Sequence, residues 1–176
     1  IEDIKVGDEV LSYDPDTRQY SMQMVEDIEK PIRDHYYHIE FDDDSYLNVT
    51  NEHPLYTRKD DYVGWGSIDP LASLHGYNMF VKKIQNSDYI YSYDNTWKQV
   101  KRITLVKGNI QTFNLKRISN TKTFFANGFL AHNKDGTVID DKDNAPPTGV
   151  SDSGGGNEAP SYEPGSVPDD GLEGKN

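Results

Sequence analysis

Apolar and polar residues alternate along most of the first 133 positions, which predicts β-strands in nearly all of this region. The runs 35–41 and 46–50 are rich in β-branched and aromatic residues and flank the polar segment 42–45, so we expect a hairpin there. Further strands are predicted at 9–12, 22–29, 78–81, 89–93, 98–105 and 111–116. Gly108-Asn109 is predicted to form a turn between two of them.

The last two apolar runs, 124–126 and 129–132, bracket Asn127-Gly128. An Asn-Gly pair between two such runs is the strongest short signal for a hairpin. Helix is predicted only at 69–74, about one turn long, where Asp69 can cap the first turn and Pro70 takes the first helical position. The patterns together predict an all-β domain over residues 1–133.

Residues 134–176 differ sharply from the region before them. They contain eight of the fourteen glycines and five of the nine prolines, and Tyr162 is their only aromatic residue. A segment of this composition buries too little apolar surface to offset the entropy lost on ordering. We therefore expect a folded domain at 1–133, followed by a disordered acidic tail or linker at 134–176.

Charge and composition exclude several classes of function. The segment 134–176 holds ten Asp and Glu against three Lys, which accounts for −7 of the net charge of −12, and no basic stripe stands out. Phosphate backbones would be repelled, which argues against nucleic-acid binding. Anionic membrane surfaces are disfavoured too, and no apolar run approaches the roughly twenty residues that cross a bilayer. The lack of cysteine excludes disulfides within this sequence and leaves the compartment open.

The end of the last predicted strand carries a candidate self-cleavage device, His132-Asn133. An asparagine side chain can attack its own main-chain carbonyl, close a succinimide and expel the next residue, here Lys134, as a free amine. The uncatalysed reaction is slow, because an amide nitrogen is a poor nucleophile and an amine is a poor leaving group. His132 is adjacent and is a candidate proton donor to the departing nitrogen.

Residues 49–56 contain a Thr-x-x-His pattern formed by Thr50 and His53. Residues 1–14 precede it, and the segments 112–116 and 125–133 follow it. In this order, the blocks resemble the Hint family, the self-processing domains shared by Hedgehog proteins, inteins and bacterial intein-like modules. The resemblance implies a compact, strand-rich, pseudo-two-fold fold that processes its own chain without a cofactor.

The resemblance also implies roles for individual residues. His53 would hold and protonate the amide nitrogen that leaves at an upstream junction, with Thr50 bonding to the same peptide. The family's N-terminal nucleophile, a Cys or less often a Ser, has no counterpart here, so we expect a segment carrying it to precede Ile1. Lys122 stands where many members carry another His; it could stabilise an oxyanion but would be a poor proton shuttle, and a solvated turn residue is the simpler interpretation.

Splicing in the family requires a Cys, Ser or Thr directly after the asparagine, whereas this chain has Lys134, so cleavage is favoured over splicing. The implied partners are the chain's own flanking segments, and we expect a monomer. No metal site is expected, because His35 and His38 would point to opposite faces of a strand and residues 134–144 lack the full ligand set of a calcium loop. The alternative is a Hint scaffold that no longer cuts and serves as a folded spacer or binding module.

Overall fold

A computed structural model describes residues 1–134, which form twelve strands and one helix. The elements are β1 (Glu9–Asp14), β2 (Gln19–Glu29), β3 (Ile32–Phe41), β4 (Tyr46–Val49), β5 (Leu55–Lys59), β6 (Tyr62–Ser67), α1 (Pro70–Tyr77), β7 (Lys82–Lys83), β8 (Tyr89–Tyr91), β9 (Trp97–Gln111), β10 (Asn114–Ile118), β11 (Thr123–Ala126) and β12 (Phe129–His132). The tail expected at 134–176 lies outside the described residues, apart from Lys134.

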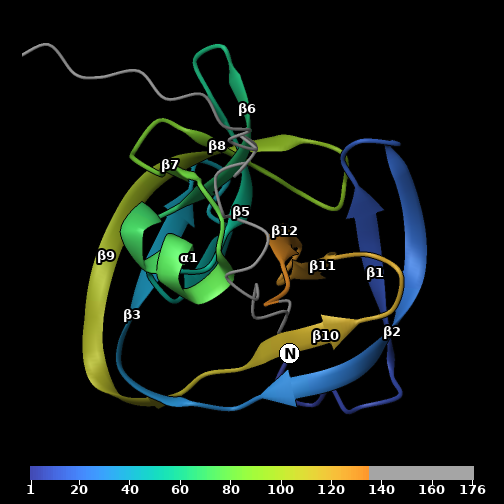
Figure 1. Ribbon diagram of the computed structural model, residues 1–176. Helices are drawn as coiled ribbons and strands as arrows, with labels where there is room; N and C mark the ends of the chain where they lie inside the picture. Colours follow the sequence, from blue (N-terminus) through green and yellow to red (C-terminus); the bar gives the residue numbers. More distant parts are fainter. Residues whose placement is uncertain (135–176) are drawn as a thin grey trace, which may run out of the picture. The chain divides into compact units, whose positions relative to one another are not determined.

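The strands form two sheets. β1, β2 and β10 make a three-stranded antiparallel sheet in the order β1-β2-β10. The larger sheet runs β11-β12-β5-β8-β9-β3-β4, and β6 joins it through β5 and carries β7 on its other side. In Figure 1 the long strands β2, β3 and β9 curve around the periphery, while the β11–β12 hairpin lies in the middle. The prediction of an all-β domain is confirmed.

Both predicted hairpins are present. β3 pairs with β4 in antiparallel register, with Tyr37 opposite Val49 and Ile39 opposite Leu47. β11 and β12 are joined by Asn127-Gly128, whose φ angles of 47° and 86° are both positive. Positive φ at both central residues is what a tight two-residue hairpin turn requires, and it explains why an Asn-Gly pair stands there.

Three local predictions were wrong or incomplete. Gly108-Asn109 forms no turn, because β9 continues through it and the pairing with β3 shifts register at this point. A β-bulge accommodates the one extra residue in β9, and the φ of 152° at Gly108 suits glycine. No strand forms at 78–81, because the helix extends to Tyr77 and Asn78 caps its end. The β5–β6 hairpin was not predicted from the sequence.

Helix α1 begins as predicted. The Asp69 carboxylate accepts hydrogen bonds from the Leu71 and Ala72 amides, and Pro70 occupies the first turn. The buried Ser73 hydroxyl lies 2.6 Å from the Glu52 carbonyl oxygen, so the helix is tied to the loop between β4 and β5. This tie places the C-terminal end of α1, with Tyr77, against that loop.

The main core contains buried side chains from both sheets. It includes Phe41, Leu55, Leu115 and Phe124, and the Phe41 ring stacks on Phe129 at a centroid distance of 4.1 Å. Burying aromatic and aliphatic side chains of this size is the main source of stability. No helix among residues 1–134 is long and apolar enough to cross a membrane.

Candidate functional site

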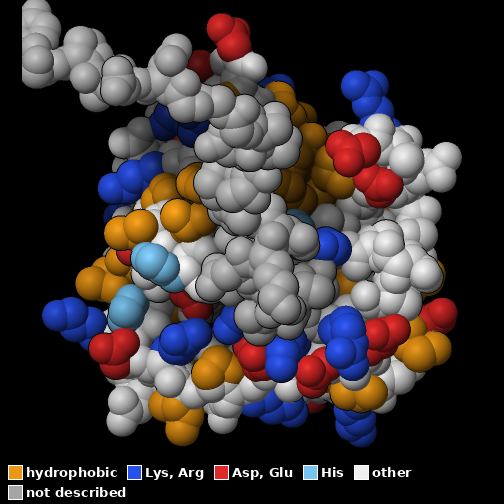
Figure 2. Space-filling model, in the orientation of Figure 1, with side chains coloured by type: hydrophobic (Ala, Val, Ile, Leu, Met, Phe, Trp, Pro, Cys, Tyr) orange, Lys and Arg blue, Asp and Glu red, His pale blue; other side chains and the backbone are white. Residues whose placement is uncertain are grey.

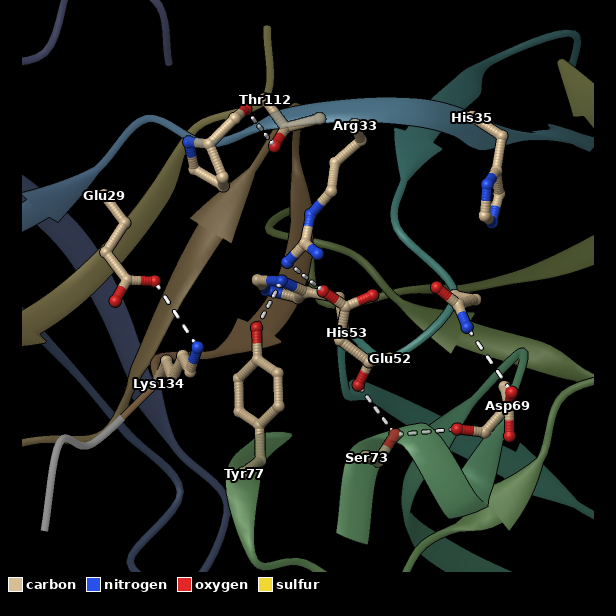
Figure 3. Close-up of polar contacts among 12 residues, drawn as sticks. Glu29, Arg33, His35, Glu52, His53, Asp69, Ser73, Tyr77, Thr112 and Lys134 are labelled. Atoms are coloured by element: carbon tan, nitrogen blue, oxygen red, sulfur yellow. Dashed lines mark hydrogen bonds and ion pairs between the residues drawn. The ribbon is translucent and has the colours of Figure 1, made fainter. Parts of the chain in front are cut away.

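The loop between β4 and β5 carries Thr50 and His53. His53 is only 9% exposed; its ring packs edge-on against Phe124, and its Nδ1 lies 2.8 Å from the Tyr77 hydroxyl. Figure 3 shows the Tyr77 side chain rising from α1 toward this imidazole. The backbone amide of His53 also donates to the Thr50 carbonyl, which closes the loop into a turn. His53 is therefore held in place by side chains of α1 and β11, which are distant from it in sequence.

The surroundings keep His53 uncharged. Burial lowers the pKa of His53 from its ordinary value of 6.5 to about 4, and the nearby charge of His132 acts in the same direction. Burial also raises the pKa of Tyr77, which therefore keeps its proton and can donate it to Nδ1. With Nδ1 as acceptor, Nε2 carries the ring proton, so His53 at neutral pH is a hydrogen-bond donor rather than a cation.

Asn133 follows β12 and is 2% exposed. Its main-chain amide donates to the Lys122 carbonyl at 2.7 Å, and its side-chain Nδ2 donates to the Lys116 carbonyl at 3.3 Å. Its Oδ1 is buried and has no hydrogen-bond partner among residues 1–134. The side chain that would react is thus held inside the protein instead of extending into solvent.

His132 occupies the last position of β12, and its ring meets Trp65 edge-on at 5.0 Å. Its Nδ1 lies 2.7 Å from the main-chain carbonyl oxygen of Asn133. From the sequence, we expected this imidazole to serve the departing nitrogen of Lys134. In the structure Nδ1 contacts the carbonyl oxygen, so a proton on Nδ1 would polarise the main-chain carbonyl of Asn133.

A cavity of about 530 Å³ opens beside the β4–β5 loop. Thr50, His53, Asn114 and Lys134 are among the residues that line it, together with Tyr77. The structure therefore brings Thr50 and His53 to one site, beside the residue that follows Asn133.

The predicted residue Lys122 is exposed, and the contact it makes with Asn133 is through its main-chain carbonyl, which accepts a hydrogen bond from the Asn133 amide. Because the contact is made by the backbone, it does not depend on which side chain stands at this position.

Two residues at the site had no signal in the sequence. Tyr77 ends a short helix, and Asn114 begins β10 with an Oδ1 that is buried without a partner among the described residues. Only the fold brings them to His53, where the Asn114 amide opposes the rise in the pKa of Tyr77 that burial causes. Within residues 1–134 no three His, Asp or Glu side chains come close enough together to hold a metal ion.

Comparisons with known proteins bear on the fold. No protein-family model matches the sequence, and no curated protein matches it. The solved structure of a bacterial intein-like domain from Clostridium thermocellum is 20% identical with a TM-score of 0.59, over 75% of this chain and 86% of that chain. A DnaB intein from Synechocystis sp. PCC 6803 is 14% identical with a TM-score of 0.56, over 73% and 80%. The gp41-1 intein is 22% identical with a TM-score of 0.54, over 75% and 84%. The chain therefore has the intein-type, or Hint-type, fold that the sequence resemblance predicts.

Proposed function

We propose that this domain processes its own chain once, by cyclising Asn133 and releasing the residues after it. One observation carries the proposal: the Asn133 side chain is buried, while His132 Nδ1 lies 2.7 Å from the Asn133 carbonyl oxygen. The likeness to inteins supports a self-processing role for the fold. The partners of the reaction are then the chain's own flanking segments.

The chemical step needs no cofactor or water. Asn133 Nδ2 attacks the Asn133 carbonyl carbon, and the bond between this carbon and the Lys134 nitrogen breaks. One proton leaves Nδ2 and one reaches the Lys134 nitrogen, so the products are a C-terminal aminosuccinimide and a free amine. His132 stabilises the negative charge that develops on the carbonyl oxygen. The Lys116 carbonyl accepts a hydrogen bond from Nδ2 and increases the electron density on the attacking nitrogen.

We place a second, upstream junction in the cavity beside Thr50 and His53. His53 is neutral there, and its Nε2–H can donate to a peptide group that lies in the cavity. Asn114 also lines the cavity, and its Oδ1, which has no hydrogen-bond partner within residues 1–134, can accept a main-chain N–H of such a peptide. Both groups suit a peptide substrate, since they complement its carbonyl and amide groups.

The test is the intact mass of the freshly made 176-residue chain, followed over time. We expect loss of residues 134–176 and an N-terminal fragment one water lighter than a hydrolysed product, because it ends in aminosuccinimide. Asn133→Ala should stay whole. Asn86→Ala is the matched control, because Asn86 is exposed in a loop, and it should cleave at the parent rate.

Two results contradict the proposal. A parent chain that stays whole supports the alternative of an inactive Hint scaffold. A fragment that ends in a free carboxylate at Asn133 shows hydrolysis by another route.

A further inference from the structure

The bond between Asn133 and Lys134 is held on both sides by the same pair of strands, β2 and β10. On one side, the carbonyl of Lys116 in β10 accepts the Asn133 side-chain hydrogen bond. On the other side, Glu29 at the end of β2 forms an ion pair with Lys134, with 3.6 Å between Oε2 and Nζ. Figure 3 shows the Glu29 and Lys134 side chains pointing toward each other.

We propose that Glu29 is a specificity-determining residue that selects a basic side chain directly after the scissile bond. The inference rests on the proposed cleavage after Asn133 and adds a preference for the residue at the next position. The ligand class is a cationic side chain, lysine or arginine, at position 134.

The charges around Lys134 favour a cation there. Lys116 Nζ lies 3.8 Å from Glu29 and 3.6 Å from Asp27, so these three side chains carry two negative charges and one positive charge. Lys134 supplies the second positive charge and balances the cluster. Acidic and basic side chains are also interspersed along the lower part of Figure 2, where β2 and β10 lie in Figure 1. An acidic residue at 134 would be repelled by Glu29, and a neutral one would leave Glu29 without this partner.

Holding Lys134 matters for the chemistry because cyclisation requires a bent chain. The attacking Asn133 Nδ2 and the departing Lys134 nitrogen meet at the same carbonyl carbon. If Lys134 is free to move, more conformational entropy is lost when the chain adopts the reactive geometry. With Lys116 fixing one side of the bond and Glu29 the other, fewer chain conformations compete. Glu29 pairs directly with Asn114 in the β2–β10 ladder, so its backbone is firmly placed.

The effect of Glu29 on the cleavage rate should be modest, because the ion pair with Lys134 is partly exposed to solvent. The Glu29 and Lys134 side chains are 31% and 35% exposed, so water and salt screen the pair. We expect Glu29→Gln to slow release of residues 134–176 about three-fold at low ionic strength. Glu29→Lys should slow it further, and the difference between parent and variants should shrink at high salt.

The experiment compares release rates, followed by intact mass, for the full chain and its variants. Lys134→Arg should cleave like the parent, while Lys134→Glu should be slowed. The exchange Glu29→Lys with Lys134→Glu should recover much of the rate that each single change loses. Glu26→Gln is the matched control, because it removes the 2.8 Å pair with Arg117 on the same two strands without touching Lys134, and its rate should equal that of the parent.

The outcomes separate the two proposals. If the parent cleaves and both Glu29 variants keep its rate, or if Glu26→Gln slows cleavage as much as Glu29→Gln does, the selection by Glu29 is overturned. If the parent releases nothing, the proposed function itself fails, and the selection fails with it. Recovery in the charge exchange supports the selection, since general damage to the fold would make the two losses add.

Discussion

The buried imidazole of His53 should make the stability of this domain fall as the solution becomes mildly acidic. His53 is 9% exposed, and burial lowers its pKa from 6.5 to about 4. Between these values the unfolded chain binds a proton that the folded chain rejects. The stabilisation is therefore complete above pH 6.5 and is lost as the pH falls through about 4.

The loss of unfolding free energy is set by the size of the pKa shift of His53. Each pKa unit is worth about 1.4 kcal/mol, so a depression from 6.5 to about 4 corresponds to about 3 kcal/mol of unfolding free energy between neutral pH and pH 4. A loss of this size is a large fraction of the stability of an ordinary domain, which is about 5–15 kcal/mol. The effect should be visible well before carboxylates begin to titrate.

The assay is urea unfolding followed by tryptophan fluorescence at several pH values between about 7 and about 4.5, on the parent and on His53→Gln. Trp65 and Trp97 pack in the aromatic cluster around Tyr91 and report on the folded state. The parent should lose stability steadily over this range, and the variant should lose markedly less. Subtracting the two curves removes the contributions of the other histidines.

The reasoning would be refuted by equal pH dependence in the parent and in His53→Gln. An independent check is the NMR titration of the His53 ring protons, and a midpoint close to the ordinary value of 6.5 would contradict the argument directly. Such a midpoint would also mean that His53 is partly charged near neutral pH, so the donor role assigned to its Nε2–H would need revision.

Three further changes test how the site is supported, each by urea unfolding. Asp69→Ala removes the cap of α1 and should cost about 1 kcal/mol, with Asp69→Asn as a control that keeps a capping oxygen. Gly66→Ala should cost about 1–3 kcal/mol, since a Cβ there would stand 2.9 Å from the Ile84 side chain; unchanged stability would show that the neighbours yield easily. Thr123→Val should cost about 1–3 kcal/mol, because it takes a partner from the buried Ser12 hydroxyl at 2.8 Å, whereas Thr123→Ser should be milder.

Local sequence signals predicted much of the fold. The Asn127-Gly128 turn, the hairpin at 35–50 and the Asp69 cap each depend on a few neighbouring residues, and all three are present. The same kind of signal was misleading at Gly108, where pairing with β3 keeps the strand continuous through a residue pair typical of turns. A turn signal gives a preference of limited strength, and a ladder of hydrogen bonds on a neighbouring strand can override it.

At the candidate site, too, local sequence signals predicted some features and tertiary contacts decided others. His132 and Asn133 adjoin in sequence, and the short pattern of Thr50 and His53 could be recognised by its resemblance to a family. The contact between His132 Nδ1 and the Asn133 carbonyl oxygen could not be read from the sequence. A ring orientation depends on its packing, here against Trp65, and packing is decided by strands distant in the chain.

By itself, the sequence determined the strand-rich character of residues 1–133, the two hairpin turns, the start of the helix and the identity of the candidate reactive asparagine. These features arise from alternation, turn chemistry and capping, which act over a few residues. Only the tertiary structure brought Tyr77 to His53, Lys116 to Asn133 and Glu29 to Lys134. The physical reason is that burial, and contact between residues from different strands, arise only when the sheets pack. No short stretch of sequence therefore predicts the neutral state of His53 or the ion pair between Glu29 and Lys134.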